Sequence, residues 1–202
     1  MIRNVVFDVG GVMLRLRYQP FVRYLQDAGA DLHDLPSWLA TIGLEAHERG
    51  EIPGGELLER VATTARRPLD RDDLHRRWLD MFERTDEMFE LAAGLMARHR
   101  VYLLSNVGDL HWAHMDRVYG IERVGHGAIA SFRVGAIKPQ PEIYRIAEQQ
   151  LGLEPRATVF VDDLARNVAG ARACGWHAIH HVNPAMTRES LAALGVRVDR
   201  AG

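Results

Sequence analysis

Acidic, hydroxyl, amide and lysine side chains occur in this sequence around points where short apolar segments end. They are Asp8, Ser105, Asn106, Lys138, Asp162 and Asp163. Carboxylates that lie close together bind hard divalent cations such as Mg²⁺ through their oxygen atoms. A lysine with neighbouring hydroxyl and amide donors binds the oxygens of an anion. If these residues meet in space, they form a site suited to an anionic phosphate compound.

Each of these residues also has an ordinary structural explanation when it is considered alone. An acid that follows a strand is commonly a helix cap or a turn residue, and two acids at the start of a helix are favoured by the helix dipole. The functional interpretation depends on the position that they share. The apolar segments and the residues that follow them are 5–7 with Asp8, 101–104 with Ser105 and Asn106, and 158–161 with Asp162 and Asp163.

The apolar segments are rich in β-branched and aromatic residues, which predicts buried strands. From about residue 86 onward, strands alternate with helical segments such as 109–119 and 142–151, and further short strands are expected at 128–132 and 178–182. This alternation predicts a three-layer, Rossmann-like α/β fold with a parallel sheet. Ligands of such sheets bind beyond the carboxyl ends of the strands, where the polar residues stand.

The segment from about Tyr18 to Arg84 has a different pattern, because its apolar residues follow only a helical period. Glycine and proline residues divide it into several short helices. We therefore expect a small all-helical cap over residues 16–85, inserted after the first strand. The remaining residues, 1–15 and 86–202, would form the α/β core, with the cap over the edge of the sheet near Asp8.

The composition favours a globular protein of the cytoplasm. The chain has 202 residues, of which 47% are hydrophobic, and its 25 basic and 27 acidic residues give a net charge of −2. This balance does not call for a nucleic-acid or membrane partner. Cys174, the single cysteine, cannot form a disulfide within the chain, and no apolar segment is long enough to cross a bilayer. We expect a small-molecule partner and frayed C-terminal residues, while the oligomeric state stays open.

Taken in order along the chain, these motifs resemble those of the haloacid dehalogenase-like hydrolase superfamily. The motifs are FDVGGV at 7–12, LSN at 104–106, IKP at 137–139 and FVDD at 160–163. The resemblance covers nearly the whole chain, and the order of the motifs makes it more specific than any one of them. The segments 47–52 and 163–171 are similar to the branch with a helical cap after the first motif, which includes many small phosphatases.

The resemblance implies a role for each motif residue, with Asp8 as the nucleophile that forms an aspartyl-phosphate. Mg²⁺ would be bound by Asp8, the backbone carbonyl of Gly10 and Asp163, with Asp162 behind them. The phosphate would be bound by Ser105, Asn106 and Lys138. Asn167 would support the acidic loop. Mg²⁺ and Lys138 would offset the repulsion between an anionic nucleophile and an anionic substrate. The catalytic residues implied are therefore Asp8 and Lys138.

Gly10 departs from the pattern of most phosphatases in this superfamily, which carry at this position a second aspartate that protonates the leaving group and then activates water. General acid–base help is worth about 10²–10⁴-fold in rate. Its absence implies a slow enzyme, a substitute acid or a persistent aspartyl-phosphate. Glu45, His47 and Glu48 of the cap are candidates to replace the acid or contact the substrate, and Arg17 and Tyr18 could also contact the substrate, although an ordinary structural position is the stronger explanation for each of them.

These observations favour a Mg²⁺-dependent phosphomonoester hydrolase that acts on a small organic phosphate, such as a sugar phosphate. One alternative is a very slow or non-enzymatic regulator that binds phosphate or accepts a phosphoryl group, because Gly10 has no acid–base chemistry. A second alternative is a 2-haloacid dehalogenase, which would displace halide with Asp8 and need no metal. The paired acids Asp162 and Asp163 argue against it, and a mutase would need the missing acid–base group.

Overall fold

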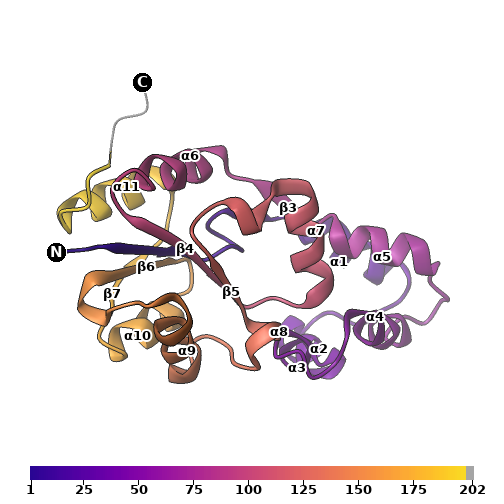
Figure 1. Ribbon diagram of the computed structural model, residues 1–202. Coiled ribbons are helices and arrows are strands. Elements are labelled where there is room, and N and C mark those ends of the chain that lie inside the picture. Colours follow the sequence, from indigo (N-terminus) through magenta and orange to yellow (C-terminus); the bar gives the residue numbers. More distant parts are fainter. Residues whose placement is uncertain (199–202) are drawn as a thin grey trace.

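Five parallel strands form the central sheet of the protein, shown by a computed structural model that describes residues 1–198 (Figure 1). The strands are β1 (Asn4–Phe7), β4 (Arg100–Ser105), β5 (Ala128–Ala130), β6 (Thr158–Asp162) and β7 (His177–His180). Their order across the sheet is β5, β4, β1, β6 and β7. In the middle of the sheet, Phe7 of β1 pairs with Leu103 of β4 and with Val161 of β6. The carboxyl ends of these three strands therefore meet at one edge, as the sequence predicts.

Helices cover both faces of the sheet and complete the predicted three-layer fold (Figure 1). One face carries α6 (Asp86–Leu95), α7 (Asp109–Tyr119) and α11 (Pro184–Ala193), and the other carries α9 (Pro141–Leu151) and α10 (Ala165–Ala173). Successive side chains of β1 point to opposite faces, so Val5 and Phe7 pack into the first layer and Val6 into the second. All three are fully buried, as is typical of a strand with helices on both sides.

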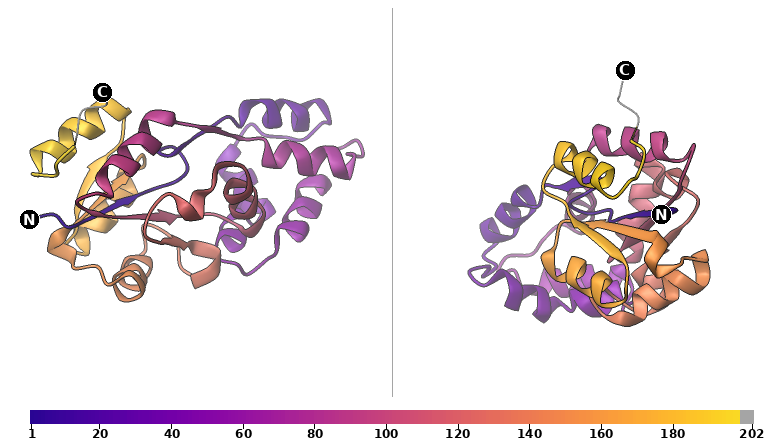
Figure 2. Two further views of the ribbon diagram at one scale, coloured as in Figure 1. Left: turned by 45° about the horizontal axis from the view of Figure 1, so that its top comes forward. Right: turned by 90° about the vertical axis from the view of Figure 1, so that its left-hand side faces the viewer.

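Five helices follow the first strand and form a unit with its own apolar core, which we call the cap (Figure 2). They are α1 (Gln19–Asp27), α2 (Leu35–Ile42), α3 (Leu44–Glu48), α4 (Gly54–Thr63) and α5 (Arg71–Leu79). Leu25, Leu57 and Val61 lie in the centre of this core and are fully buried. The predicted helical insertion is thus confirmed.

Two short strands flank the cap and differ from the sequence expectation. β2 (Leu14–Leu16) and β3 (Phe82–Arg84) pair in antiparallel fashion, with Leu16 opposite Phe82. The expectation that the segment up to Arg84 contains only helices was therefore wrong at β3. Three residues are too few to show a strand period, and this strand exists because β2 lies beside it.

Smaller differences concern the ends of elements. The strand expected at 128–132 stops at Ala130, where the short helix α8 (Ser131–Val134) begins. The last strand starts one residue earlier than expected and ends two residues earlier, at His180, and α11 was not predicted at all. Two 3₁₀ helices, Ile121–Arg123 and Pro155–Ala157, complete the fold. The expected fraying of the last residues concerns positions 199–202, outside the described residues.

Among the helices of residues 1–198, none combines the length and the apolar character needed to span a membrane.

Candidate active site

Three carboxylates meet at the carboxyl ends of the neighbouring strands β1 and β6. Asp8 follows β1, Asp162 is the last residue of β6 and Asp163 comes next. Each offers an oxygen atom, and these oxygens all lie within 4.8 Å of one another. Carboxylate oxygens at this spacing suit a hard divalent cation such as Mg²⁺. The fold therefore brings together the three acids that the sequence analysis assigned to a metal.

Gly11 makes the close approach of Asp163 possible. Its backbone has a φ of +82°, in the left-handed region that favours glycine. A Cβ atom at this position would lie 2.3 Å from Oδ2 of Asp163. The second glycine of the first motif thus leaves room for the carboxylate of the fourth motif.

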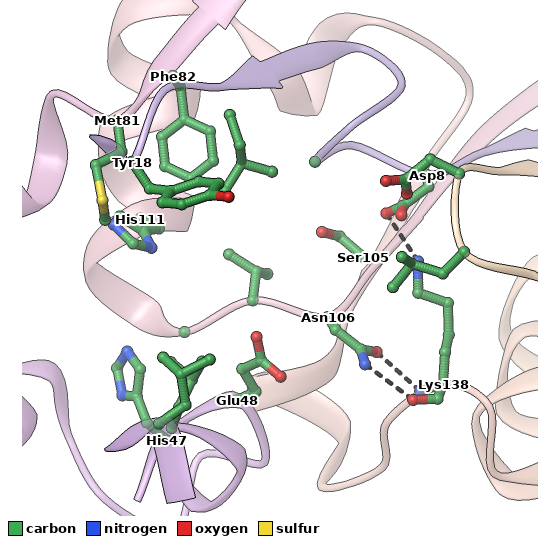
Figure 3. A pocket seen from close by; sticks show the side chains of 18 of the residues that line it. Asp8, Tyr18, His47, Glu48, Met81, Phe82, Ser105, Asn106, His111 and Lys138 are labelled. Carbon is green, nitrogen blue, oxygen red and sulfur yellow. Dashed lines mark hydrogen bonds and ion pairs between the residues drawn. The ribbon is translucent and has the colours of Figure 1, made fainter. Parts of the chain in front are cut away.

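Lys138 connects these acids to the loop that follows β4. Its ammonium group, which is almost fully buried, lies 2.7 Å from Oδ1 of Asp8 and 2.8 Å from Oδ2 of Asp162, and it donates to the carbonyl of Leu104. The side chain of Asn106 holds the backbone of Lys138 (Figure 3). Asn106 Oδ1 accepts from the lysine amide over 2.8 Å, and Nδ2 donates to the lysine carbonyl over 3.0 Å. Lys138 is therefore held in place both at its ammonium group and at its backbone.

Asp162 is held by donors on several sides. Nδ2 of Asn167 lies 3.0 Å from each of its carboxylate oxygens, and the amide of Leu164 donates to Oδ1 over 2.8 Å. The hydroxyl of Tyr144 donates in turn to the carbonyl of Asn167. A carboxylate that accepts this many hydrogen bonds is held firmly in place. Asp162 therefore orients Lys138, and Asn167 lies where the sequence analysis placed a supporting residue.

Burial dominates the protonation of the cluster. It raises the pKa of Asp8 to about 8; Lys138 opposes the rise, and Asp162 adds to it. Burial and Asp162 also raise the pKa of Asp163. Burial by itself would lower the pKa of Lys138, but the charges of Asp8 and Asp162 outweigh it and raise the pKa. Three acids beside one lysine leave excess negative charge, which a bound divalent cation would balance.

A cavity of about 460 Å³ lies between this edge of the sheet and the cap. The motif residues that line it are Asp8, Gly10, Ser105, Asn106, Lys138, Asp163 and Asn167. Figure 3 shows Asp8, Ser105 and Lys138 at one end and the side chains of the cap at the other. Residues from four distant motifs therefore share one cavity, as the sequence analysis expects.

The structure separates the cap positions that the sequence analysis singled out. Tyr18 and His47 line the cavity, whereas Arg17 and Glu45 do not. Arg17 pairs with Glu83 over 3.3 Å, and Glu45 pairs with Arg49 one helical turn later. Both of these side chains are exposed, so the expectation that they contact a substrate is corrected.

Glu48 reaches the cavity from the end of α3 and faces the loop that holds Ser105 and Asn106 (Figure 3). Burial raises its pKa to about 7, while the positive charges of Lys138 and Arg166 oppose the rise. Within residues 1–198 its carboxylate makes no hydrogen bond or ion pair. The sequence alone does not distinguish Glu48 from its exposed neighbour Glu45.

His111 also lines the cavity, and no pattern in the sequence indicates this position. Its ring stacks on Trp78 with 4.7 Å between ring centres, and its Nε2 donates to the carbonyl of Trp78 over 2.8 Å. Burial lowers its pKa to about 4, so the ring is neutral at physiological pH. Trp78 belongs to the cap helix α5, 33 residues before His111 along the chain, and only the folded structure brings the two rings together.

Comparison with known proteins agrees with this arrangement of sheet, cap and acids. The family model described as haloacid dehalogenase-like hydrolase matches residues 2–175. The chain belongs to this family of hydrolases.

Two characterised relatives are similar over most of their length. The chain is 26% identical over 215 residues to a D-ribitol-5-phosphate phosphatase of Bacteroides thetaiotaomicron, covering 96% of this chain and 98% of that protein. It is also 26% identical over 180 residues to the sesquiterpene phosphatase astK of Aspergillus oryzae, covering 88% of this chain and 89% of that protein. Both relatives are phosphatases by name.

A solved structure shares the fold. It is a HAD family enzyme from Bacteroides thetaiotaomicron in complex with magnesium and inorganic phosphate. The TM-score is 0.77 at 23% sequence identity, and the match covers 89% of this chain and 93% of that chain. The expectation of Mg²⁺ agrees with the acid cluster here and with the ion in that complex.

Proposed function

We propose that the protein is a Mg²⁺-dependent phosphomonoester hydrolase that forms an aspartyl-phosphate on Asp8. The observation that carries this proposal is the cluster of Asp8, Asp162 and Asp163 around a buried lysine at the edge of the sheet. Membership of a hydrolase family and the two phosphatase relatives support it. The roles of the individual residues are assigned from the positions of their side chains in the cavity.

The donor set fits a magnesium ion. Asp8, Asp163 and the backbone carbonyl of Gly10 would hold it, and the bound ion would neutralise charge on the phosphate oxygens. Ser105 and the ammonium group of Lys138 are the donors placed to bind the remaining phosphate oxygens. Asp162 and Asn106 keep the lysine in position for this contact.

Hydrolysis would proceed in two displacements at phosphorus. In the first, a carboxylate oxygen of Asp8 forms a bond to phosphorus while the bond from phosphorus to the alcohol oxygen breaks. In the second, a water oxygen forms the new bond to phosphorus, and the Asp8 carboxylate leaves. A covalent intermediate of this kind divides one difficult reaction into two easier ones.

We assign the proton transfers, which Gly10 cannot perform, to Glu48. Its protonated carboxyl group would give a proton to the departing alcohol oxygen, and its carboxylate would take one from the attacking water. A pKa of about 7 allows both forms near neutral pH, which is what acid–base catalysis requires. The free carboxylate that faces the cavity opposite Ser105 supports this role (Figure 3).

The proposal is tested by phosphate release from 4-nitrophenyl phosphate, with Mg²⁺ and with a chelator instead. We expect metal-dependent turnover that Asp8→Asn abolishes and that Asp27→Asn, an exposed acid on α1, leaves intact. Labelling of Asp8 without turnover would favour the regulator, and halide release from a 2-haloacid without metal would favour the dehalogenase. Either result would overturn the proposal.

A further inference from the structure

The cap end of the cavity is built almost entirely from apolar and aromatic side chains. Those that define it are Tyr18, Phe21, Trp38, Trp78, Met81 and Phe82, from α1, α2, α5 and the segment that leads into β3. Figure 3 shows Tyr18, Met81 and Phe82 together on the wall that faces Glu48. The cavity is therefore polar around Asp8 and apolar away from it.

At the cap end of the cavity, the nitrogen atoms of the tryptophan and histidine rings either donate hydrogen bonds within the protein or are buried. Nε1 of Trp38 donates to Thr64, and Nε2 of His111 donates to the carbonyl of Trp78. Nδ1 of His47 donates to the carbonyl of Ile52. Nε1 of Trp78 and Nε2 of His47 are buried and have no hydrogen-bond partner among the described residues, and Nε2 of His47 lies 3.8 Å from Oδ1 of Asp109. A polyhydroxy group would find few hydrogen-bond partners here.

The cap end of the cavity also contains little charge. The neutral ring of His111 lies between Trp78 and Phe82, stacked on the first and edge-on to the second. The His111 ring therefore adds a flat, uncharged surface to the cap end of the cavity. Apart from the motif residues and the engaged rings, the polar groups that line the cavity are the carboxyl group of Glu48, the hydroxyl of Tyr18 and the guanidinium group of Arg166. Arg166 is an exposed residue beside Glu48, and these three groups are too few for a row of sugar hydroxyls. Buried hydroxyl groups without partners are costly, whereas apolar groups gain from leaving water.

We propose that the substrate is the phosphate monoester of a hydrophobic alcohol, an aliphatic or aromatic hydrocarbon rather than a sugar or another polyol. This inference rests on the proposed function, because it places the phosphate at Asp8. The hydrocarbon then extends across the cavity against Trp78, Met81 and Phe82. The volume of about 460 Å³ lies in the range usual for small-molecule sites, about 300–1,000 Å³, so it accommodates more than a phosphate alone.

The first experiment compares alkyl phosphates of increasing chain length with ribitol 5-phosphate and 4-nitrophenyl phosphate, all with Mg²⁺. We expect kcat/KM to rise by about threefold for each added methylene, mainly through KM, until the cavity is filled. The polyol phosphate should be the poorest substrate. If ribitol 5-phosphate is as good a substrate as decyl phosphate, or if chain length has no effect, the inference is wrong while the proposed function stands.

Variants locate the effect in the cavity. Leu39 of α2 is half-buried and lines the cavity, whereas Leu58 of α4 is half-buried in the same cap but does not line it. Leu39→Gln should lower kcat/KM for decyl phosphate by about tenfold. It should change turnover of ethyl phosphate by less than about twofold. Leu58→Gln should affect neither substrate, and equal losses in both variants would contradict the assignment of the cavity wall.

A binding measurement keeps the inference testable if no compound is hydrolysed. Alkyl phosphonates cannot be cleaved at the carbon–phosphorus bond by this chemistry, so their binding reports the cavity without turnover. With Mg²⁺ present, calorimetry should give a Kd for decylphosphonate at least about tenfold below that of methylphosphonate. Equal affinities would overturn the inference. Failure of 4-nitrophenyl phosphate hydrolysis together with tight decylphosphonate binding would instead overturn the proposed function alone.

Discussion

The hydroxyl of Ser131 donates to the backbone carbonyl of Glu48 over 2.6 Å and joins the end of the cap helix α3 to the core. The same hydroxyl accepts from the amide of Val107, which follows Asn106, the residue whose side chain holds the backbone of Lys138. Nearby, a Cβ on Gly50 would lie 2.2 Å from the carbonyl of Phe132, so this contact between cap and core is tight. One fully buried serine therefore fixes the distance between Glu48 and the phosphate end of the cavity.

Ser131→Ala tests this coupling. The substitution leaves a buried carbonyl and amide without a partner, and we expect it to lower the free energy of unfolding by about 1–3 kcal/mol. Displacement of Glu48 should lower kcat for an alkyl phosphate more than it raises KM. Urea unfolding and steady-state kinetics measure the two effects. Ser190→Ala, on α11 away from the cavity, is the control and should change neither. Normal kcat in a destabilised Ser131→Ala protein would show that Glu48 needs no such support.

Glu48→Gln tests the proton donor. Removal of a general acid should lower kcat/KM for an alkyl phosphate by about 10²–10⁴-fold. Formation of the aspartyl-phosphate from 4-nitrophenyl phosphate, whose leaving group needs little protonation, should be far less affected. Stopped-flow absorbance should then show a burst of nitrophenol followed by slow turnover, since water activation is also lost. With an alkyl phosphate, the fall in wild-type activity above about pH 7 should disappear in the variant.

Glu45→Gln is the matched control for this variant, because Glu45 lies on the same helix, is exposed and pairs with Arg49. It should behave like the wild-type protein with both substrates. If Glu48→Gln lowers kcat/KM for alkyl phosphates and for 4-nitrophenyl phosphate by the same factor, Glu48 shapes the site without donating a proton.

Gly11→Ala tests the approach of Asp163 to the first motif. The new Cβ would overlap the carboxylate of Asp163, and a φ of +82° strains an alanine. We expect a loss of stability of about 1–2 kcal/mol and a marked loss of Mg²⁺ affinity, measured by calorimetry. Gly94→Ala on α6 is the control. A Cβ there meets nothing within 4 Å, so this variant should gain about 0.5–1 kcal/mol without a change in metal binding.

The raised pKa of Asp8 predicts how the metal-free protein responds to pH. The folded pKa of about 8 lies above the ordinary value of 3.8, so the folded state binds more protons between these values. Stability should therefore fall as the pH rises through this window. Between about pH 5 and pH 8 we expect Asp8 to contribute a loss of at least about 1 kcal/mol. The measurement is urea unfolding with a chelator at several pH values.

Asp8→Asn isolates this contribution, because asparagine does not titrate. The variant should be more stable than the wild-type protein at about pH 8 and gain less at about pH 5, in the absence of metal. Added Mg²⁺ should stabilise the wild-type protein more as the pH rises, since the ion binds the deprotonated carboxylates. A variant whose stability follows the wild-type pH profile would show that Asp8 titrates normally.

The edge of the sheet that carries the acid cluster could be predicted from the sequence because its signals are local. Asp8 and Asp162 stand at or just beyond the ends of strong apolar strands, and parallel strands align their carboxyl ends at one edge. Short apolar segments between helices were sufficient to predict the sheet and the helical insertion. The position of Lys138 at the centre of the acid cluster followed from its motif rather than from a periodic pattern.

The cap side of the cavity could not be predicted in the same way. Glu45, His47 and Glu48 lie within one turn of the same helix, and the docking of that helix on Ser131 decides which side chain faces the cavity. The neighbours of His111 depend likewise on how α5 packs against α7. Such contacts depend on tertiary packing between distant segments, so one sequence without its folded structure does not specify them.

The chain enters and leaves the cap through the paired strands β2 and β3. Leu14 and Arg84 are register partners, so the chain leaves the core and returns to it at adjacent points. An unrelated helical segment could be grafted between these points without redirecting the sheet below. Because Glu48, the proposed proton donor, lies inside the exchanged segment, such a chimera would have a new cap side of the cavity and would also need a proton donor of its own.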